Sequence, residues 1–363
     1  MTMNIQDELT VARYEPDFDL PNGFPVYNTP ITPRENYFRY VRREDPLWVP
    51  SPRDIITILP RMIPDVKARG LVCDGDPVPF DPDKDAGGPD MYGIDWVWVP
   101  TVGGSMVKPG SPFLDEVDEW RGKVKKPDLD SWGDWAALEE QTKPYWSGSR
   151  IVNTTVYTGI FERLISMMDF ENSAMALIDD DEKEGLHELF DFYTSVNEEI
   201  LEYLHKYIHA DMVTFHDDWG SQRAPFFSLN TCREMLVPYL KRVVDKAHSL
   251  GMIFTFHCCG MNEPLVPAMI EAGVDLWSGQ PLNNWDTLSP LYGDKIFFDA
   301  CEGPYNEKVH GSRENYLKIC FEKWQHYKDC NGVLFACGRK SFEFADGELF
   351  KLTYPISREL LAQ

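Results

Sequence analysis

Phe254-Thr255-Phe256-His257-Cys258-Cys259-Gly260 joins a β-prone apolar run to a histidine and two cysteines. We predict a buried strand here that ends in a loop carrying soft metal ligands. Because side chains alternate along a strand, His257 and Cys259 share one face and Cys258 points the other way. Imidazole and thiolate together suit zinc. A core strand with a hydrogen-bonded histidine and two inert thiols is the competing interpretation.

Strand-like and helix-like segments alternate from residue 151 to residue 363. Short apolar runs are separated by longer segments with helical spacing, one of which opens with a capping box, Thr231-Cys232-Arg233-Glu234. Such alternation predicts parallel βα units, so we expect an α/β fold of the (β/α)8 TIM-barrel class. A doubly wound open sheet is the alternative, but the chain lacks the glycine-rich first βα turn of that class. The predicted strands lie at 151–157, 211–215, 252–259, 274–278, 296–301 and 333–337.

Residues 1–150 have a different texture, in which prolines and aromatic residues are interleaved, as in Pro46-Leu47-Trp48-Val49-Pro50. Residues 92–100 are typical of a strand in a small sheet or hairpin. We predict one domain over residues 1–363. In it, residues 1–150 form an irregular N-terminal extension and the first elements, packed on the barrel, and residues 151–363 form the main βα units.

The charge balance of the sequence restricts its partners. Lys and Arg number 35 and Asp and Glu number 59, which gives a net charge of −24. Nucleic acids and anionic membrane surfaces would be repelled, so we expect neither as a partner. No apolar run approaches the roughly 18 residues of a membrane span. Residues 1–8 lack the pattern of an export signal and the 8 cysteines do not form a disulfide scaffold, so we expect a cytoplasmic protein.

Polar and ligand-type residues gather where the predicted strands end, which is where parallel α/β folds place their active groups. These residues are Asp217 and Asp218, His257 and Cys259, Cys301 and Glu302, and Cys337. Closure of a barrel would bring strand ends together, so we predict a zinc site held by His257, Cys259 and Cys337. Three protein ligands with a fourth position open are typical of catalytic zinc.

Other residues compete for places in this site. Glu162, at the first strand-to-helix junction, and Glu302 are candidates for a fourth ligand that substrate displaces. Cys301 also ends a strand and is an alternative to Cys337 as the second thiolate. His216, which precedes an aspartate, is interpreted as part of a hydrogen-bonded core pair rather than as a ligand.

Three residues after the 211–215 strand are assigned roles beside the metal. Asp218 is the candidate proton donor, or a carboxylate that orients a ligand, with a loop or helix-cap carboxylate as the alternative. Trp219 and Asp217 are expected to line the substrate pocket, and for Trp219 a packed core aromatic is the alternative.

The motifs resemble a known family. His257-Cys258-Cys259-Gly260 with a distant Cys337-Gly338 resembles the His-x-Cys-Gly…Cys pattern of the zinc-dependent, cobamide-linked methyltransferases, a branch of the uroporphyrinogen decarboxylase superfamily. Further segments that look like the superfamily lie at 32–38, 46–50, 216–220 and 245–251. The Arg-Gln-Ala-Gly-Arg segment with which true uroporphyrinogen decarboxylases grip substrate carboxylates is missing from the sequence.

The resemblance implies a (β/α)8 barrel that transfers a methyl group between a small molecule and the cobalt of a corrinoid protein. The sequence has no cobamide-binding Asp-x-His-x-x-Gly segment, so we expect the cobamide on a separate partner. The small molecule would be a methoxylated aromatic or other methyl ether as donor, or a thiol as acceptor, and the sequence selects neither the substrate nor the direction. A metal-free decarboxylase-like lyase and a non-catalytic zinc-binding barrel closed by four protein ligands are the alternative functions.

Overall fold

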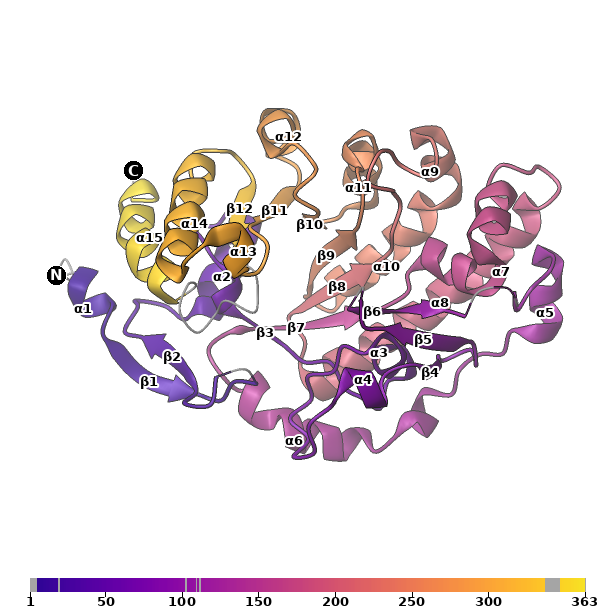
Figure 1. Ribbon diagram of the computed structural model, residues 1–363, viewed down its shortest axis with the longest axis horizontal. Helices are drawn as coiled ribbons and strands as arrows, with labels where there is room; N and C mark the ends of the chain where they lie inside the picture. Colours follow the sequence, from indigo (N-terminus) through magenta and orange to yellow (C-terminus); the bar gives the residue numbers. More distant parts are fainter. Residues whose placement is uncertain are drawn as a thin grey trace. The chain divides into compact units, whose positions relative to one another are not determined.

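The computed structural model describes residues 5–18, 20–101, 103–108, 110, 112–336 and 347–362 (Figure 1). The chain separates into two compact units. One comprises Met1–Ile56, Pro144–Val152 and Asp275–Gln363, and is called the first unit; the other comprises Thr57–Lys143 and Asn153–Val274, and is called the second unit. Cys337, a predicted zinc ligand, lies outside the described residues.

The second unit is built on parallel strands that alternate with helices. Its strands are β7 (Ile151–Val156), β8 (Met212–His216) and β9 (Ile253–Cys258), and its main helices are α7 (Ile160–Ala176), α8 (Lys183–Ile208), α9 (Leu229–Met235), α10 (Val237–Ser249) and α11 (Val266–Ala272). The register pairs Thr154 with Val213 and Val213 with Phe254. All six residues of β7 are buried, and Val213, Phe215, Phe254 and Phe256 have no exposed surface. Apolar burial of this extent holds the strand ends at fixed positions.

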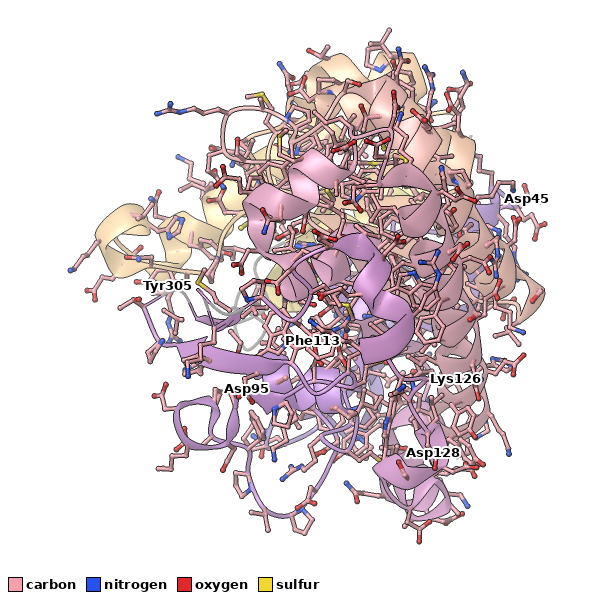
Figure 2. The ribbon with its side chains drawn as sticks, turned by 90° about the vertical axis from the view of Figure 1, so that its right-hand side faces the viewer. Asp45, Asp95, Phe113, Lys126, Asp128 and Tyr305 are labelled. Carbon is pink, nitrogen blue, oxygen red and sulfur yellow. The ribbon has the colours of Figure 1, made fainter. Side chains whose placement is uncertain are left out.

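A small antiparallel sheet precedes these strands in the second unit. It contains β4 (Gly88–Pro89), β5 (Asp95–Val99) and β6 (Gly104–Val107), and the helices α3 (Pro64–Arg69), α4 (Pro82–Asp85), α5 (Trp120–Lys123) and α6 (Trp135–Trp146) belong to the same part of the chain. The predicted strand at 92–100 is thus confirmed as β5. Arg163 of α7 forms ion pairs with Asp65 and Asp90, all three buried, and so ties the helix to this region. Charged side chains such as Asp95, Lys126 and Asp128 lie on the outside (Figure 2).

The first unit has a second set of parallel strands, β10 (Leu276–Gly279), β11 (Phe297–Cys301) and β12 (Val333–Ala336). Its other elements are α1 (Ile5–Glu8), β1 (Val11–Glu15), β2 (Phe24–Tyr27), α2 (Pro33–Arg42), β3 (Ile55–Thr57), α12 (Trp285–Tyr292), α13 (Glu307–His310), α14 (Arg313–Tyr327) and α15 (Gly347–Leu360). An aromatic cluster of Tyr27, Trp48, Phe350 and Tyr354 joins the beginning of the chain to α15. Glu8 of α1 accepts hydrogen bonds from Tyr354 and Arg358.

The fold class predicted from the sequence is confirmed: the chain is an α/β protein of the (β/α)-barrel type, with parallel strands and intervening helices. The six predicted strands correspond to β7 to β12. The helix before β9 begins earlier than the capping box predicts, because the Ser228 hydroxyl, rather than Thr231, accepts the hydrogen bond from the Thr231 amide at 3.1 Å. In the described part of the chain, no helix has the length and apolar character needed to cross a membrane.

Candidate metal centre

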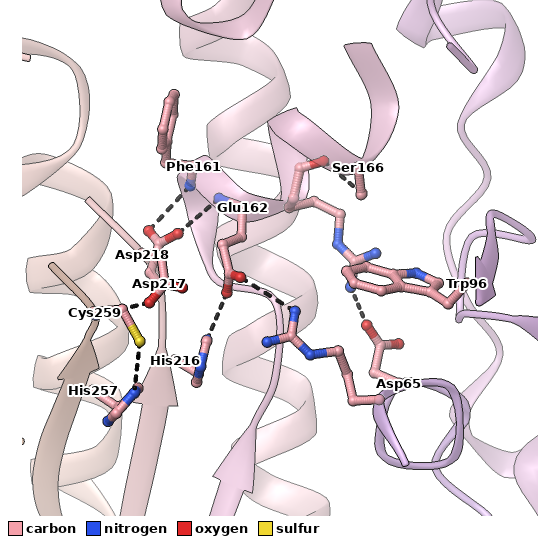
Figure 3. A network of polar contacts seen from close by, with 12 residues as sticks. Asp65, Trp96, Phe161, Glu162, Ser166, His216, Asp217, Asp218, His257 and Cys259 are labelled. Atoms are coloured by element: carbon pink, nitrogen blue, oxygen red, sulfur yellow. Dashed lines mark hydrogen bonds and ion pairs between the residues drawn. The ribbon is translucent and has the colours of Figure 1, made fainter. Parts of the chain in front are cut away.

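Four ligand-type side chains converge at the carboxyl ends of β8 and β9 (Figure 3). His216, Asp218, His257 and Cys259 each offer one ligand atom, and these atoms all lie within 4.8 Å of one another. The parallel register places His216 directly beside His257. Because each strand carries a second ligand two residues after its histidine, both pairs face the same side. The two imidazole rings stack at 4.7 Å between centroids.

Two glycines allow the loops after β8 and β9 to approach closely. Gly260 has φ +94°, and a Cβ atom there would lie 2.3 Å from the carbonyl carbon and oxygen of Gly220. Neither a left-handed backbone nor this contact is compatible with a side chain. The loops are also joined by backbone hydrogen bonds from Asp217 to His257 (3.0 Å) and from Met261 to Ser221 (2.8 Å). The glycines therefore bring the two pairs of ligands together.

Hydrogen bonds within the cluster orient its members. The backbone N–H of Cys259 donates to Asp218 Oδ1 at 2.8 Å, and His257 Nε2 lies 3.3 Å from Cys259 Sγ. Burial raises the pKa of the Cys259 thiol, and the Asp218 carboxylate raises it further. Burial and Glu162 likewise raise the pKa of Asp218. Two anionic ligands held this close oppose each other's ionisation, and a bound cation would remove that opposition.

Glu162, at the start of α7, lies beside the cluster. Its Oε2 is 2.6 Å from His216 Nδ1, and its Oε1 is 3.2 Å from a guanidinium nitrogen of Arg69. Burial alone would raise the pKa of Glu162, but Arg69 and His216 lower it to about 2. Burial lowers the pKa of His216, but Glu162 outweighs it and the net direction is upward. Glu162 is therefore ionised and already bonded to two partners.

Asp217 supports the backbone rather than an open pocket. Its carboxylate accepts hydrogen bonds from the amides of Phe161 and Glu162, at 3.0 and 2.7 Å, and from the Trp219 indole at 3.0 Å. It thereby caps the N-terminus of α7. Burial and then the charge of Glu162 raise the pKa of Asp217 to about 7, against the effect of these hydrogen bonds.

Trp219 differs from the sequence expectation in the same way. Its side chain has no exposed surface, and its ring packs on Phe256 at 4.6 Å. The structure places Trp219 and Asp217 in the interior, where neither side chain lines an open pocket. Cys258 is also fully buried, and its Sγ accepts hydrogen bonds from the Trp219 amide and the Asn262 side chain. It points away from the cluster, as the alternation along the strand predicts.

The remaining predicted residues belong to the first unit. Glu302 forms ion pairs with Lys323 (2.5 Å) and His310 (3.5 Å). Cys301 lies at the end of β11 and lines a pocket of about 300 Å³ together with Trp285 and Lys323. Both residues are described within that unit alone.

The donor set fits zinc. Two imidazoles, one thiolate and one carboxylate are all zinc ligands, and four donors suit its tetrahedral preference. Among the described residues, no other group of three or more His, Cys, Asp or Glu side chains has such an arrangement. The residues with this potential are His216, Asp218, His257 and Cys259, of which the sequence analysis selected His257 and Cys259 as ligands and Asp218 as a neighbour.

His216 was assigned to the core by the sequence analysis, but the structure brings it into the cluster. A signal for this is present in the sequence. His216-Asp217-Asp218 and His257-Cys258-Cys259 both place a histidine and a second ligand two residues apart at the end of a strand, and a glycine follows each. Two successive strands with the same pattern predict a shared site once the strands are taken to be parallel neighbours.

Comparisons with known proteins agree with this picture. Residues 148–295, which contain the whole cluster, match the family described as uroporphyrinogen decarboxylase. No curated protein sequence matches the chain. Among solved structures, a methyltransferase from Methanosarcina mazei is similar with a TM-score of 0.60 and 14% identity, over 92% of this chain and 100% of that chain. Xylanase B from Clostridium stercorarium is similar with a TM-score of 0.34 and 11% identity, over 56% of this chain and 72% of that chain.

The family match lies across β7 to β10, and the M. mazei structure shares the fold over nearly the whole chain. The expected relationship is thereby confirmed: this chain belongs to the uroporphyrinogen decarboxylase superfamily.

Proposed function

We propose that the protein is a zinc-dependent methyltransferase that moves a methyl group between a small molecule and the cobalt of a corrinoid carried on a separate protein. The observation that carries the proposal is the four-donor cluster at the ends of β8 and β9, inside the range that matches the family. A metal-free lyase would leave this combination of a buried thiol, a carboxyl group and two imidazoles without a role.

We assign His257 and Cys259 as zinc ligands, and add His216 and Asp218 as candidates from their position in the cluster. Cys337, outside the described residues, remains a proposed ligand on the strength of the sequence pattern. Glu162 is assigned a supporting role, since its two oxygens are engaged by His216 and Arg69. Glu302, also engaged, remains a sequence-based candidate for a displaceable ligand.

A bound zinc ion would lower the pKa of a substrate thiol or polarise the oxygen of a methyl ether. Asp218 is the residue placed to move a proton. Its Oδ1 is held by the Cys259 amide, which leaves Oδ2 to accept a proton from a thiol or to donate one to a departing ether oxygen. The fixed loops keep this carboxyl group beside Cys259 throughout.

The substrate is proposed as a methoxylated aromatic or other methyl ether, or a thiol acceptor, and the partner as a corrinoid protein. The M. mazei neighbour is described as a methyltransferase, which agrees with this class of reaction. The support for the corrinoid is the sequence pattern around His257 and Cys337.

The experiment compares neighbouring cysteines. We expect about one zinc per chain, the stoichiometry of a single four-donor site. Cys259→Ser should lose most of the zinc and of the methyl transfer to or from a cobamide-loaded protein, because a hydroxyl is a poorer zinc ligand than a thiolate. Cys258→Ser is the matched control and should keep both. A zinc-free protein with full activity would remove zinc from the proposal, and methyl transfer without any corrinoid species would remove the partner.

A closed, non-catalytic zinc site is the second candidate, favoured by the presence of four donors rather than three within 4.8 Å. Four protein ligands are typical of structural zinc. X-ray absorption at the zinc edge separates the two. A coordination shell that changes when a thiol or ether substrate is added supports catalysis, whereas an unchanged shell and no methyl transfer support the structural site.

A further inference from the structure

We infer that Glu162 and Arg69 are positioning residues for the metal. Glu162 fixes the ring of His216 so that its Nε2 is presented as a ligand, and Arg69 holds Glu162 in place. The inference rests on the proposed zinc site and extends it to two residues outside the cluster. It also assigns His216 as a ligand rather than as a core histidine.

The contacts divide the work between the two oxygens of Glu162. Oε2 lies 2.6 Å from His216 Nδ1, and Oε1 lies 3.2 Å from Arg69. An ionised carboxylate can only accept hydrogen bonds, so Nδ1 of His216 carries the proton and the lone pair of the neutral ring is on Nε2. A ligating histidine commonly has its other nitrogen bonded to a carboxylate in this way.

The backbone of Glu162 is fixed independently of its side chain. Its amide donates to Asp217 Oδ1 at 2.7 Å, at the capped start of α7. Asp217 is itself bonded through its amide to the carbonyl of His257, a member of the cluster. The start of α7 and the ends of β8 and β9 are thus a connected unit, in which the Glu162 side chain has little freedom to turn away from His216.

Arg69 is restricted by its own neighbours. Its guanidinium lies over the ring of Trp96 at 5.0 Å and over that of Tyr157 at 5.7 Å. Its side chain is 14% exposed and that of Glu162 is 13% exposed, so water screens the ion pair weakly. Two aromatic faces favour a flat guanidinium over the compact ammonium of a lysine. Arg69 therefore supplies both a charge and a direction to Glu162.

The test measures zinc affinity by competition with a chromophoric chelator, in the full-length wild type and in four variants. Removing a partner of a ligating histidine typically costs about 10- to 100-fold in metal affinity. We expect a loss in that range for Glu162→Gln, and a comparable loss for Glu162→Asp, whose shorter side chain keeps the charge but withdraws the oxygen. Arg69→Met should weaken zinc binding less than these, and Arg69→Lys should recover part of that loss.

The matched control is Glu139→Gln. Glu139 also pairs with a histidine of the second unit, His209, at 2.9 Å, but neither residue belongs to the cluster. This variant should bind zinc as the wild type does. Circular dichroism identifies any variant that fails to fold, and the remaining variants at Glu162 and Arg69 then carry the test.

A double-mutant cycle distinguishes positioning from general stabilisation. If Glu162 acts through His216, Glu162→Gln should add nothing to the zinc loss of His216→Ala, and cobalt(II) absorption should change in the same way for both. Zinc affinity of Glu162→Gln equal to the wild type, or a loss that adds fully to that of His216→Ala, overturns the inference alone. A wild-type chain that binds no zinc overturns the proposed function as well.

Discussion

Gly260→Ala tests whether the close approach of two loops builds the metal centre. The added Cβ atom would lie 2.3 Å from the carbonyl of Gly220, on a backbone with φ +94°. A non-glycine residue in such a conformation costs about 1–3 kcal/mol of folding free energy. Relieving the overlap adds about 1–3 kcal/mol. The loops must separate to do so, which moves Cys259 away from Asp218, and we expect zinc to bind at least about tenfold more weakly.

Gly251→Ala is the matched control, because Gly251 has φ +79° but a Cβ atom there would meet nothing within 4 Å. It should show the backbone cost alone and leave zinc affinity unchanged. The assays are urea unfolding, followed by tryptophan fluorescence and circular dichroism, and chelator competition for zinc. The reasoning is refuted if Gly260→Ala is as stable as Gly251→Ala, or if it holds zinc as tightly as the wild type.

Two further substitutions test charges away from the cluster. Arg163→Met should lower the free energy of unfolding by about 3–5 kcal/mol, because Asp65 and Asp90 would stay buried without their partner; a loss under about 1 kcal/mol in urea unfolding would contradict this. Burial raises the pKa of Asp74, but hydrogen bonds from Arg61 outweigh it and lower the pKa overall, so the pair stabilises the fold above about pH 4 and its contribution is lost as the pH falls further. Arg61→Met should therefore cost about 2 kcal/mol at neutral pH and progressively less below about pH 4, and a pH-independent difference would be inconsistent with this origin.

The sequence was informative where local pattern and tertiary structure agree. The parallel strands were predictable because each is a short apolar run followed by a polar loop and a helix. The partition of His257, Cys258 and Cys259 followed from alternation along a single strand. These inferences need only the geometry of one element and its nearest neighbours.

What could not be predicted depends on contacts between elements. His216 looks like a core histidine until the register places it beside His257. Trp219 follows the ligands directly, yet its indole is directed into the core by the Asp217 carboxylate. Ser228 rather than Thr231 begins α9, since two hydroxyl residues three positions apart are equivalent caps by composition alone.

The discontinuity of the first unit has a consequence for synthesis on the ribosome. The aromatic cluster joins Tyr27 and Trp48 to Phe350 and Tyr354, which are translated almost three hundred residues later. At about 5–20 residues per second, the early half of that cluster waits roughly 15–60 s for α15 to emerge. The second unit, whose segments end at Val274, is complete before then. The nascent chain therefore carries unburied aromatic side chains near its beginning for most of its translation, and these are natural binding sites for chaperones.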